Sequence, residues 1–132
     1  MSKGTSYIAV TNNTGQNATI VLMWKYSDGS EYAGASQPMY TNSSANSAYT
    51  TVSYNYGFLR TGGSYWQIQV TLDDGSVYHN NWGGITDKPW YRCDLKEEDN
   101  GNNLTFTVTT EEFVMAMYGS CRQNMIPGPF GD

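Results

Sequence analysis

The sequence predicts a single α+β domain in which short helices cover a β-sheet. Several segments alternate between apolar and polar residues with the period of a β-strand, and a later segment changes to the period of a helix. Residues 17–26 carry apolar side chains on both faces, which is typical of a strand that is covered from both sides. The length of 132 residues fits one domain with one core.

Five β-strands are expected. The clearest signal is at residues 64–72, where Trp66, Ile68 and Val70 alternate with Tyr, Gln and Thr. The DDGS turn that follows has the Asp-Gly pair of a tight hairpin, so the chain should run back as a second strand. The five expected strands are residues 6–12, 17–26, 64–72, 76–81 and 103–109.

A short amphipathic helix is expected at residues 109–119. Thr109 and Glu112 have the spacing of a capping box, in which each side chain accepts a backbone hydrogen bond from the other end of the first turn. One helical face would then carry Phe113, Val114 and Met117. Residues 27–63 have loop composition, with room for a short helix, an edge strand or both.

The composition favours a neutral, hydroxyl-rich ligand. The net charge is −5 with only 7 Lys and Arg residues, which argues against nucleic acid and against docking on acidic membranes. Aromatic residues make up 14% of the chain and stand among many Ser, Asn and Thr residues. An ordinary β-rich domain with tyrosines on its strands explains the same composition. No cofactor or metal is expected, because the chain has one His and no C-x-x-C motif.

Two alternatives are open for the only two cysteines, Cys93 and Cys121. They are either buried thiols or a disulfide, and their irregular surroundings favour the disulfide, worth about 3 kcal/mol in the chain-entropy model. No apolar run is long enough to span a bilayer, and the stretch MSKGTSYIAV lacks the hydrophobic core and the cleavage site that a signal peptide would have. We therefore expect a chain that is cytoplasmic or secreted by an unconventional route, without membrane insertion.

The most unusual segment is residues 77–93, VYHNNWGGITDKPWYRC, which holds two of the four tryptophans and the only histidine. Aromatic rings can stack on the apolar faces of sugars, while amides, carboxylates and guanidinium groups bind hydroxyls. The tryptophans could instead fold inward as a small core for the loop. The candidate ligand-binding residues are Tyr78, Asn80, Asn81, Trp82, Asp87, Trp90, Tyr91 and Arg92, with Tyr54, Tyr56 and Arg60 as outer candidates.

No catalytic residues are expected, so the chain is predicted not to be an enzyme. His79 sits in a strand-like position. The three pairs of carboxylates have structural explanations: Asp73 and Asp74 lie in a turn, Glu97 and Glu98 in a solvated acidic run, and Glu111 and Glu112 at a helix start. Three rival functions stay open at this point. They are a glycan hydrolase that uses Asp74 or Asp87, a membrane-active toxin that inserts the aromatic loop, and a structural or inhibitory protein without a ligand.

Four segments together resemble a known family: NNTGQNATIVL at 12–22, VSYNYGFLRTGGSYWQIQV at 52–70, CDLKEEDNGNNLTF at 93–106 and SCRQNM at 120–125. The family consists of small single-domain proteins that are frequent in mushrooms and have nematode relatives upregulated under reduced insulin signalling. Within it, the chain looks most like the cytotoxic glycan-binding lectins of ink-cap mushrooms. The resemblance spans roughly residues 7–125.

The resemblance implies an αβα layered sandwich, with a five-stranded antiparallel sheet flanked by short helices. The second helical layer would lie within residues 27–63. It also implies a homodimer in which two sheets join edge to edge, and a pocket at that interface for fucosylated glycans with GalNAc and GlcNAc. The expected function is that of a defensive or cytotoxic lectin that cross-links cell-surface glycans.

Overall fold

The computed structural model describes residues 2–27, 32–57, 62–80 and 91–129, with the backbone alone for 27 and 32–40. In this part of the chain, ten β-strands and one short 3-10 helix, η1 (Glu97–Asp99), account for the regular structure. The strands are β1 (Ser2–Asn12), β2 (Ala18–Ser27), β3 (Tyr32–Thr41), β4 (Thr50–Tyr56), β5 (Gly63–Leu72), β6 (Val77–Asn80), β7 (Tyr91–Arg92), β8 (Asn103–Val108), β9 (Glu112–Met115) and β10 (Cys121–Pro127).

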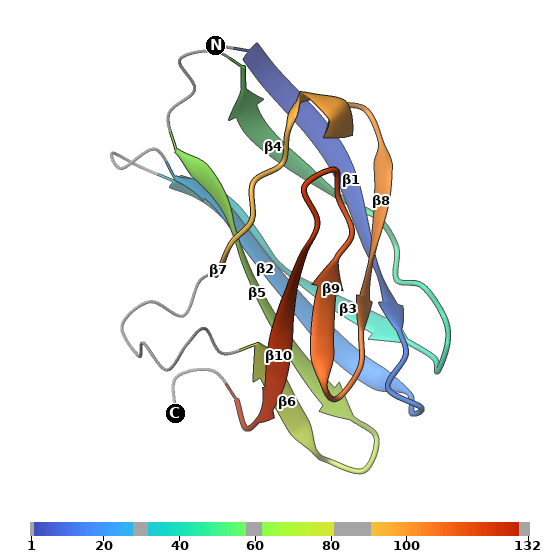
Figure 1. Cartoon of the computed structure of the whole chain (residues 1–132). Helices are drawn as coiled ribbons and strands as arrows, with labels where there is room; N and C mark the ends of the chain where they lie inside the picture. Colours follow the sequence, from blue (N-terminus) through green and yellow to red (C-terminus); the bar gives the residue numbers. More distant parts are fainter. Residues whose placement is uncertain (1, 28–31, 58–61, 81–90, 130–132) are drawn as a thin grey trace.

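The strands form one sheet that curls into a nearly closed barrel (Figure 1). Their order is β3-β2-β5-β6-β10-β9-β8-β1-β4, and β7 pairs with β5. All neighbours are antiparallel except β1 and β8, which run parallel. β3 and β4 stand at the two ends of this order and do not pair with each other in the described part of the chain. The barrel is therefore open along the seam between them.

The core fills the inside of the barrel with side chains from both halves of the sheet. Trp66 on β5 packs edge to face on Phe106 of β8, with ring centres 5.1 Å apart. Phe106 packs in the same way on Phe113 of β9, at 5.8 Å. All three side chains are almost completely buried, so this aromatic row joins the two halves of the barrel.

The predicted α+β class is wrong, because the described chain is almost entirely β. The expected five strands lie within β1, β2, β5, β6 and β8 or overlap them, but they make up only half of the strands in a mixed sheet. The apolar residues on both faces of β2 do not lie between helical layers. Val21 and Met23 on its outward face are half-buried beside Gln69 and Gln67 of β5.

The helix expected at residues 109–119 is instead a turn followed by β9. The Thr109 hydroxyl does accept hydrogen bonds from the backbone N–H groups of Glu111 and Glu112, as an N-cap would. However, the N–H of Thr109 donates to the carbonyl of Glu112, which closes a hairpin. Phe113 and Met115 then alternate inward with the period of a strand.

The prediction of a helical layer within residues 27–63 is also wrong. The described residues of this segment form β3 and β4, and the stretch between them runs along β1, where Asn46 forms an isolated bridge with Thr11. The expected joining of two five-stranded sheets edge to edge in a dimer is wrong as well, because the strands here belong to one barrel-like sheet. Within the described residues, no helix has the length and apolar character needed to cross a membrane.

Candidate functional site

The centre of the predicted aromatic loop lies outside the described residues. This applies to four of the predicted ligand-binding residues in that loop and to one outer candidate: Asn81, Trp82, Asp87, Trp90 and Arg60. The structure does place both flanks of the loop, on β6 and β7, and the outer candidates on β4. These flanks show which predicted residues are free to meet a ligand.

Asn80 is a structural residue. Its side chain is completely buried, and its carbonyl oxygen accepts a hydrogen bond from the N–H of Ile68 at 2.8 Å. Its amide nitrogen donates to the side-chain oxygen of Gln123 on β10, at 2.6 Å. The neighbouring His79 is also buried, and its Nδ1 contacts the carbonyl oxygen of Gly128. Asn80 therefore ties β5, β6 and β10 together and has no surface to offer a sugar.

The two tyrosines that flank the loop are partly used by the core. Tyr78 on β6 and Tyr91 on β7 are half-buried and pack against the interior cluster. Arg92, next to Tyr91, faces outward, but its guanidinium is held by Asp94 at 3.1 Å and by the carbonyl of Gly62. The hydrogen bond to Asp94 raises the pKa of Arg92. Its side chain as a whole is 48% exposed.

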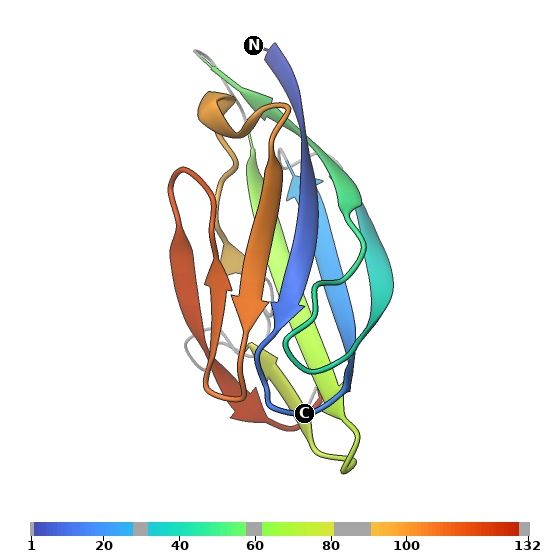
Figure 2. The ribbon, with the colours of Figure 1, turned by 90° about the vertical axis from the view of Figure 1, so that its right-hand side faces the viewer.

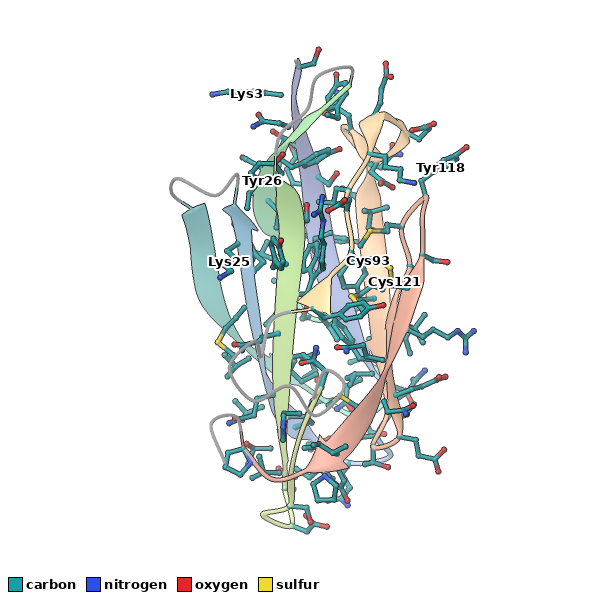
Figure 3. The ribbon with its side chains drawn as sticks, turned by 60° about the vertical axis from the view of Figure 1, so that its left-hand side comes forward. Lys3, Lys25, Tyr26, Cys93, Tyr118 and Cys121 are labelled. Atoms are coloured by element: carbon teal, nitrogen blue, oxygen red, sulfur yellow. A yellow bond between two sulfur atoms is a disulfide. The ribbon has the colours of Figure 1, made fainter. Side chains whose placement is uncertain are left out.

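A disulfide anchors the end of the aromatic loop. Cys93, directly after β7, is bonded to Cys121 at the start of β10 (Figure 3). Of the two alternatives that the sequence left open, the structure has the disulfide. The bond links the segment after β7 to β10, and it fixes the stretch from β7 to η1 against the barrel.

Tyr54 is buried beneath this segment and is structural. Its hydroxyl donates to the carbonyl of Lys96 at 2.9 Å and lies 3.3 Å from the hydroxyl oxygen of Ser6, whose own proton is donated to the carbonyl of Asp99. Burial raises the pKa of the Tyr54 hydroxyl. A Cβ at Gly4 would lie 2.8 Å from the Tyr54 ring, so the ring fits only because that position is glycine.

Tyr56, two residues further along β4, lines a depression together with residues of η1. The short helix η1 lies at one end of the barrel, shown in orange in Figure 1. The depression has a volume of approximately 310 Å³. The Tyr56 ring is half-buried, so one part packs on the barrel and another part meets solvent. The residues that line the depression are Tyr56, Gly57, Leu95, Lys96, Glu97 and Glu98.

The far wall of the depression is braced from inside by Asp99. One oxygen of this buried carboxylate accepts the N–H of Lys96 at 2.9 Å, and the other accepts the N–H of Tyr118 at 2.8 Å. The backbone carbonyl of Asp99 accepts a hydrogen bond from the Ser6 hydroxyl at 2.7 Å. Because these bonds fix the turn, the side chains of Lys96 and Glu97 start from a rigid backbone.

A second aromatic ring stands beside Lys96. Tyr118 is 65% exposed and points away from the barrel (Figure 3). The Lys96 ammonium lies 6.0 Å from the centre of its ring, a cation–π distance. Gly119 leaves room for this arrangement, since a Cβ there would lie 3.1 Å from the ammonium nitrogen.

The residues that line this depression include one aromatic residue, Tyr56, and three residues with charged side chains, Lys96, Glu97 and Glu98. Side chains of these types can donate and accept hydrogen bonds next to an aromatic ring. Within the described residues, no group of His, Cys, Asp or Glu has the arrangement of a metal site. Sequence reasoning found Tyr56 but treated Glu97 and Glu98 as a solvated acidic run. The usable signal was the turn composition of EEDNGN directly before a strand.

Comparisons with known proteins do not identify the chain. No protein-family model matches it. No curated protein matches it. Among solved structures, a chain described as "Trapped Toxin" is similar at 13% identity with a TM-score of 0.28, over 95% of this chain. This chain spans 24% of that one, and a TM-score this low does not indicate a shared fold. The resemblance to the mushroom lectin family stays a prediction, and the αβα fold that it implied is wrong.

Proposed function

We propose that this protein is a lectin that binds a neutral sugar in the depression beside Tyr56. One observation carries the proposal: a half-buried tyrosine ring and hydrogen-bonding side chains line the same depression, on a turn braced by Asp99. The apolar C–H face of a sugar would pack on the Tyr56 ring. Its hydroxyls would meet the ammonium of Lys96 and the carboxylates of Glu97 and Glu98.

The charges around the depression support a neutral ligand. Glu97 and Glu98 outnumber Lys96, and the whole chain has a net charge of −5. Anionic groups such as sulfate, phosphate and sialic acid would be repelled by this field. Hydroxyl and acetamido groups carry no net charge, so the negative charges do not repel them. Neutral and N-acetylated sugars should therefore bind best.

The size of the depression fits the end of a glycan. A volume of approximately 310 Å³ is near the lower limit of ordinary ligand pockets. A single site of this kind binds weakly, so we propose a homodimer as the functional form. Two sites on one body would raise avidity by about 10²–10⁴ without new contacts. Such a dimer could cross-link glycans on a cell surface and act as a defensive or cytotoxic lectin.

Fucosylated glycans with GalNAc and GlcNAc are the first ligands to test. This narrower specificity rests on the sequence resemblance alone. The predicted contacts in the undescribed part of the aromatic loop belong to the same proposal, with Trp82 and Trp90 as stacking rings and Asn81 and Asp87 as polar groups. The outer candidate Arg60, which precedes the loop in the sequence, belongs to it as a further polar group. Arg92, whose side chain is partly exposed, would extend the site from the described side.

The disulfide favours an oxidising compartment. Bonds such as Cys93–Cys121 persist in secreted proteins and are rare in a reducing cytosol. Of the two expected locations, we therefore propose secretion.

A glycan array followed by calorimetric titration tests the proposed function. The strongest neutral ligand from the array is titrated into the wild type, Tyr56→Ala and Tyr56→Phe. Loss of the ring in Tyr56→Ala should weaken binding about tenfold, as expected for ~1.4 kcal/mol of stacking. Tyr56→Phe keeps the ring and should bind within about threefold of the wild type.

Three results would contradict the proposal. They are a blank array from folded protein, unchanged affinity of Tyr56→Ala, and release of reducing sugar from the bound glycan. The last result would favour a hydrolase, and its loss in Glu97→Gln would assign that activity to the depression.

A further inference from the structure

The outward face of β4, β1 and β8 is rich in hydroxyl groups and almost free of charge. These strands lie side by side on one face of the barrel (Figure 2). We call this surface the hydroxyl face. Lys3, at one end, is the one charged residue among its outward positions, which are Lys3, Thr5, Tyr7, Ala9 and Thr11 on β1, Thr51, Ser53 and Asn55 on β4, and Asn103, Thr105 and Thr107 on β8.

The register of the strands sets these side chains in rows. Tyr7 lies between Thr51 on one side and Asn103 on the other. Two further rows pair Thr5 with Ser53 and Thr11 with Thr107. Neighbouring strands are about 4.8 Å apart, and outward residues repeat roughly every 6.6 Å along each strand. The hydroxyl groups therefore form a regular array.

Two tyrosines lie on this array. Tyr7 is 37% exposed and Tyr49, just before β4, is 48% exposed. The Tyr49 hydroxyl is 3.3 Å from that of Thr105 on β8, so its side chain crosses β1 to reach the next strand. Ala9 points outward at this level but is completely buried, which fits a ring lying over it. Tyr7 and Tyr49 thus lie on the same face of the sheet, the hydroxyl face.

The edge of the hydroxyl face beyond β4 is ordered by hydrogen bonds. The Thr11 hydroxyl donates to the side-chain oxygen of Asn46 at 2.6 Å. Ser47 binds the backbone of Val10 twice, through its hydroxyl and its own N–H, both at 2.9 Å. This segment leads directly into Tyr49, so the position of that ring is fixed before any ligand arrives.

We propose that the hydroxyl face binds a neutral polysaccharide chain, as a second carbohydrate site independent of the depression beside Tyr56. The chain has 19 charged residues, 12 acidic and 7 basic, yet only Lys3 belongs to this face. A charged macromolecule would find no array of opposite charge here. A neutral polymer of sugars matches the face with hydroxyls for the threonines and apolar ring faces for the two tyrosines.

Retention on insoluble polysaccharides tests this proposal. Purified protein is mixed with chitin, cellulose and an insoluble β-1,3-glucan, and the protein left in solution is measured. The wild type should be retained by at least one of them. Tyr7→Ala and Tyr49→Ala should each bind that polymer about tenfold more weakly. Arg122→Ala removes an exposed side chain on β10, outside the face, and should be retained like the wild type.

A second kind of variant guards against an effect on folding. Thr51→Glu places a charge at an exposed position beside Tyr7 and should also weaken retention while the melting temperature is unchanged. Failure of all three polymers to retain the wild type would overturn the proposal. So would equal retention of Tyr7→Ala and wild type, or equal retention of the wild type on anionic alginate.

The same variants separate this proposal from the proposed function. Tyr7→Ala should bind the soluble sugar like the wild type, and Tyr56→Ala should still be retained by the polymer. If Tyr56→Ala instead loses the polymer and Tyr7→Ala keeps it, the depression is the only carbohydrate site and the second site is disproved. If polymer retention depends on Tyr7 while soluble sugars do not bind, the hydroxyl face is a carbohydrate site. The proposal that the depression binds sugar is then disproved.

Discussion

At the scale of single residues, Asn80 is a polar residue that stabilises the fold and does not contact a ligand. Its amide is placed by β6 between a backbone N–H of β5 and Gln123 of β10. Asn80→Ala would leave both partners buried without a hydrogen bond, at about 1–3 kcal/mol for each group. We expect a loss of about 2–4 kcal/mol in the free energy of unfolding, measured by urea denaturation. If Asn80→Ala instead had unchanged stability and lost sugar binding, Asn80 would be a ligand-binding residue and not a structural one.

Asp74 gives a prediction for the pH dependence of stability. In the β5–β6 turn, its carboxylate accepts the N–H of Ser76 at 2.8 Å and a hydrogen bond from the Gln16 side chain. These bonds lower the pKa of Asp74 from its usual 3.8, so it stabilises the folded state above that pH and stops doing so as pH falls through the lower folded value. The stability difference between wild type and Asp74→Asn should therefore be constant at neutral pH and shrink below about pH 4. A difference that does not change down to pH 2 would contradict this role.

The residue types at the site were predictable from sequence to different degrees. Tyr56 stood out because aromatic residues cluster in that part of the chain, and the structure places it at the depression. The structural roles of Tyr54 and Asn80 depend on partners 42 and 43 residues away, Lys96 and Gln123. No local pattern in the sequence reveals such a partner, so the two residues looked like ligand contacts.

At the scale of elements, the misread segment at residues 109–119 has a definite cause. A Thr hydroxyl that accepts the next N–H groups starts both a helix and a tight turn, so the capping signal was real but not specific. The strand that follows, β9, has only four residues, Glu112–Met115. Its identity is decided by pairing with β8 and β10, which are other parts of the chain. The longer β5, with its clear alternation, was predicted almost to its ends.

The disulfide is the element that holds the β7–η1 segment, and its contribution is measurable. Cys93 and Cys121 are 28 residues apart, which gives about 3.5 kcal/mol of stabilisation in the chain-entropy model. The Cys93→Ser/Cys121→Ser double variant should lose about that much in the free energy of unfolding. Because the wall of the depression follows Cys93, the variant should also bind the sugar more weakly. Full sugar affinity in the folded double variant would show that Asp99 alone braces the wall.

At the scale of the whole molecule, the charge distribution predicts a binding reaction without salt dependence. Both carbohydrate surfaces that we propose for this acidic barrel would recognise neutral groups. Affinity for the array ligand should therefore change by less than about twofold between 50 and 500 mM NaCl. A steep fall in affinity with salt would show that ion pairs carry the binding and would point to an anionic ligand instead.

The most direct test of the account is to map where the sugar binds by NMR. ¹⁵N-labelled protein is titrated with the strongest neutral ligand from the glycan array, and backbone amide shifts are followed. We expect the largest changes at Gly57, Lys96 and Glu97, around the depression beside Tyr56. Changes confined to other parts of the barrel, or none at saturating sugar, would contradict it.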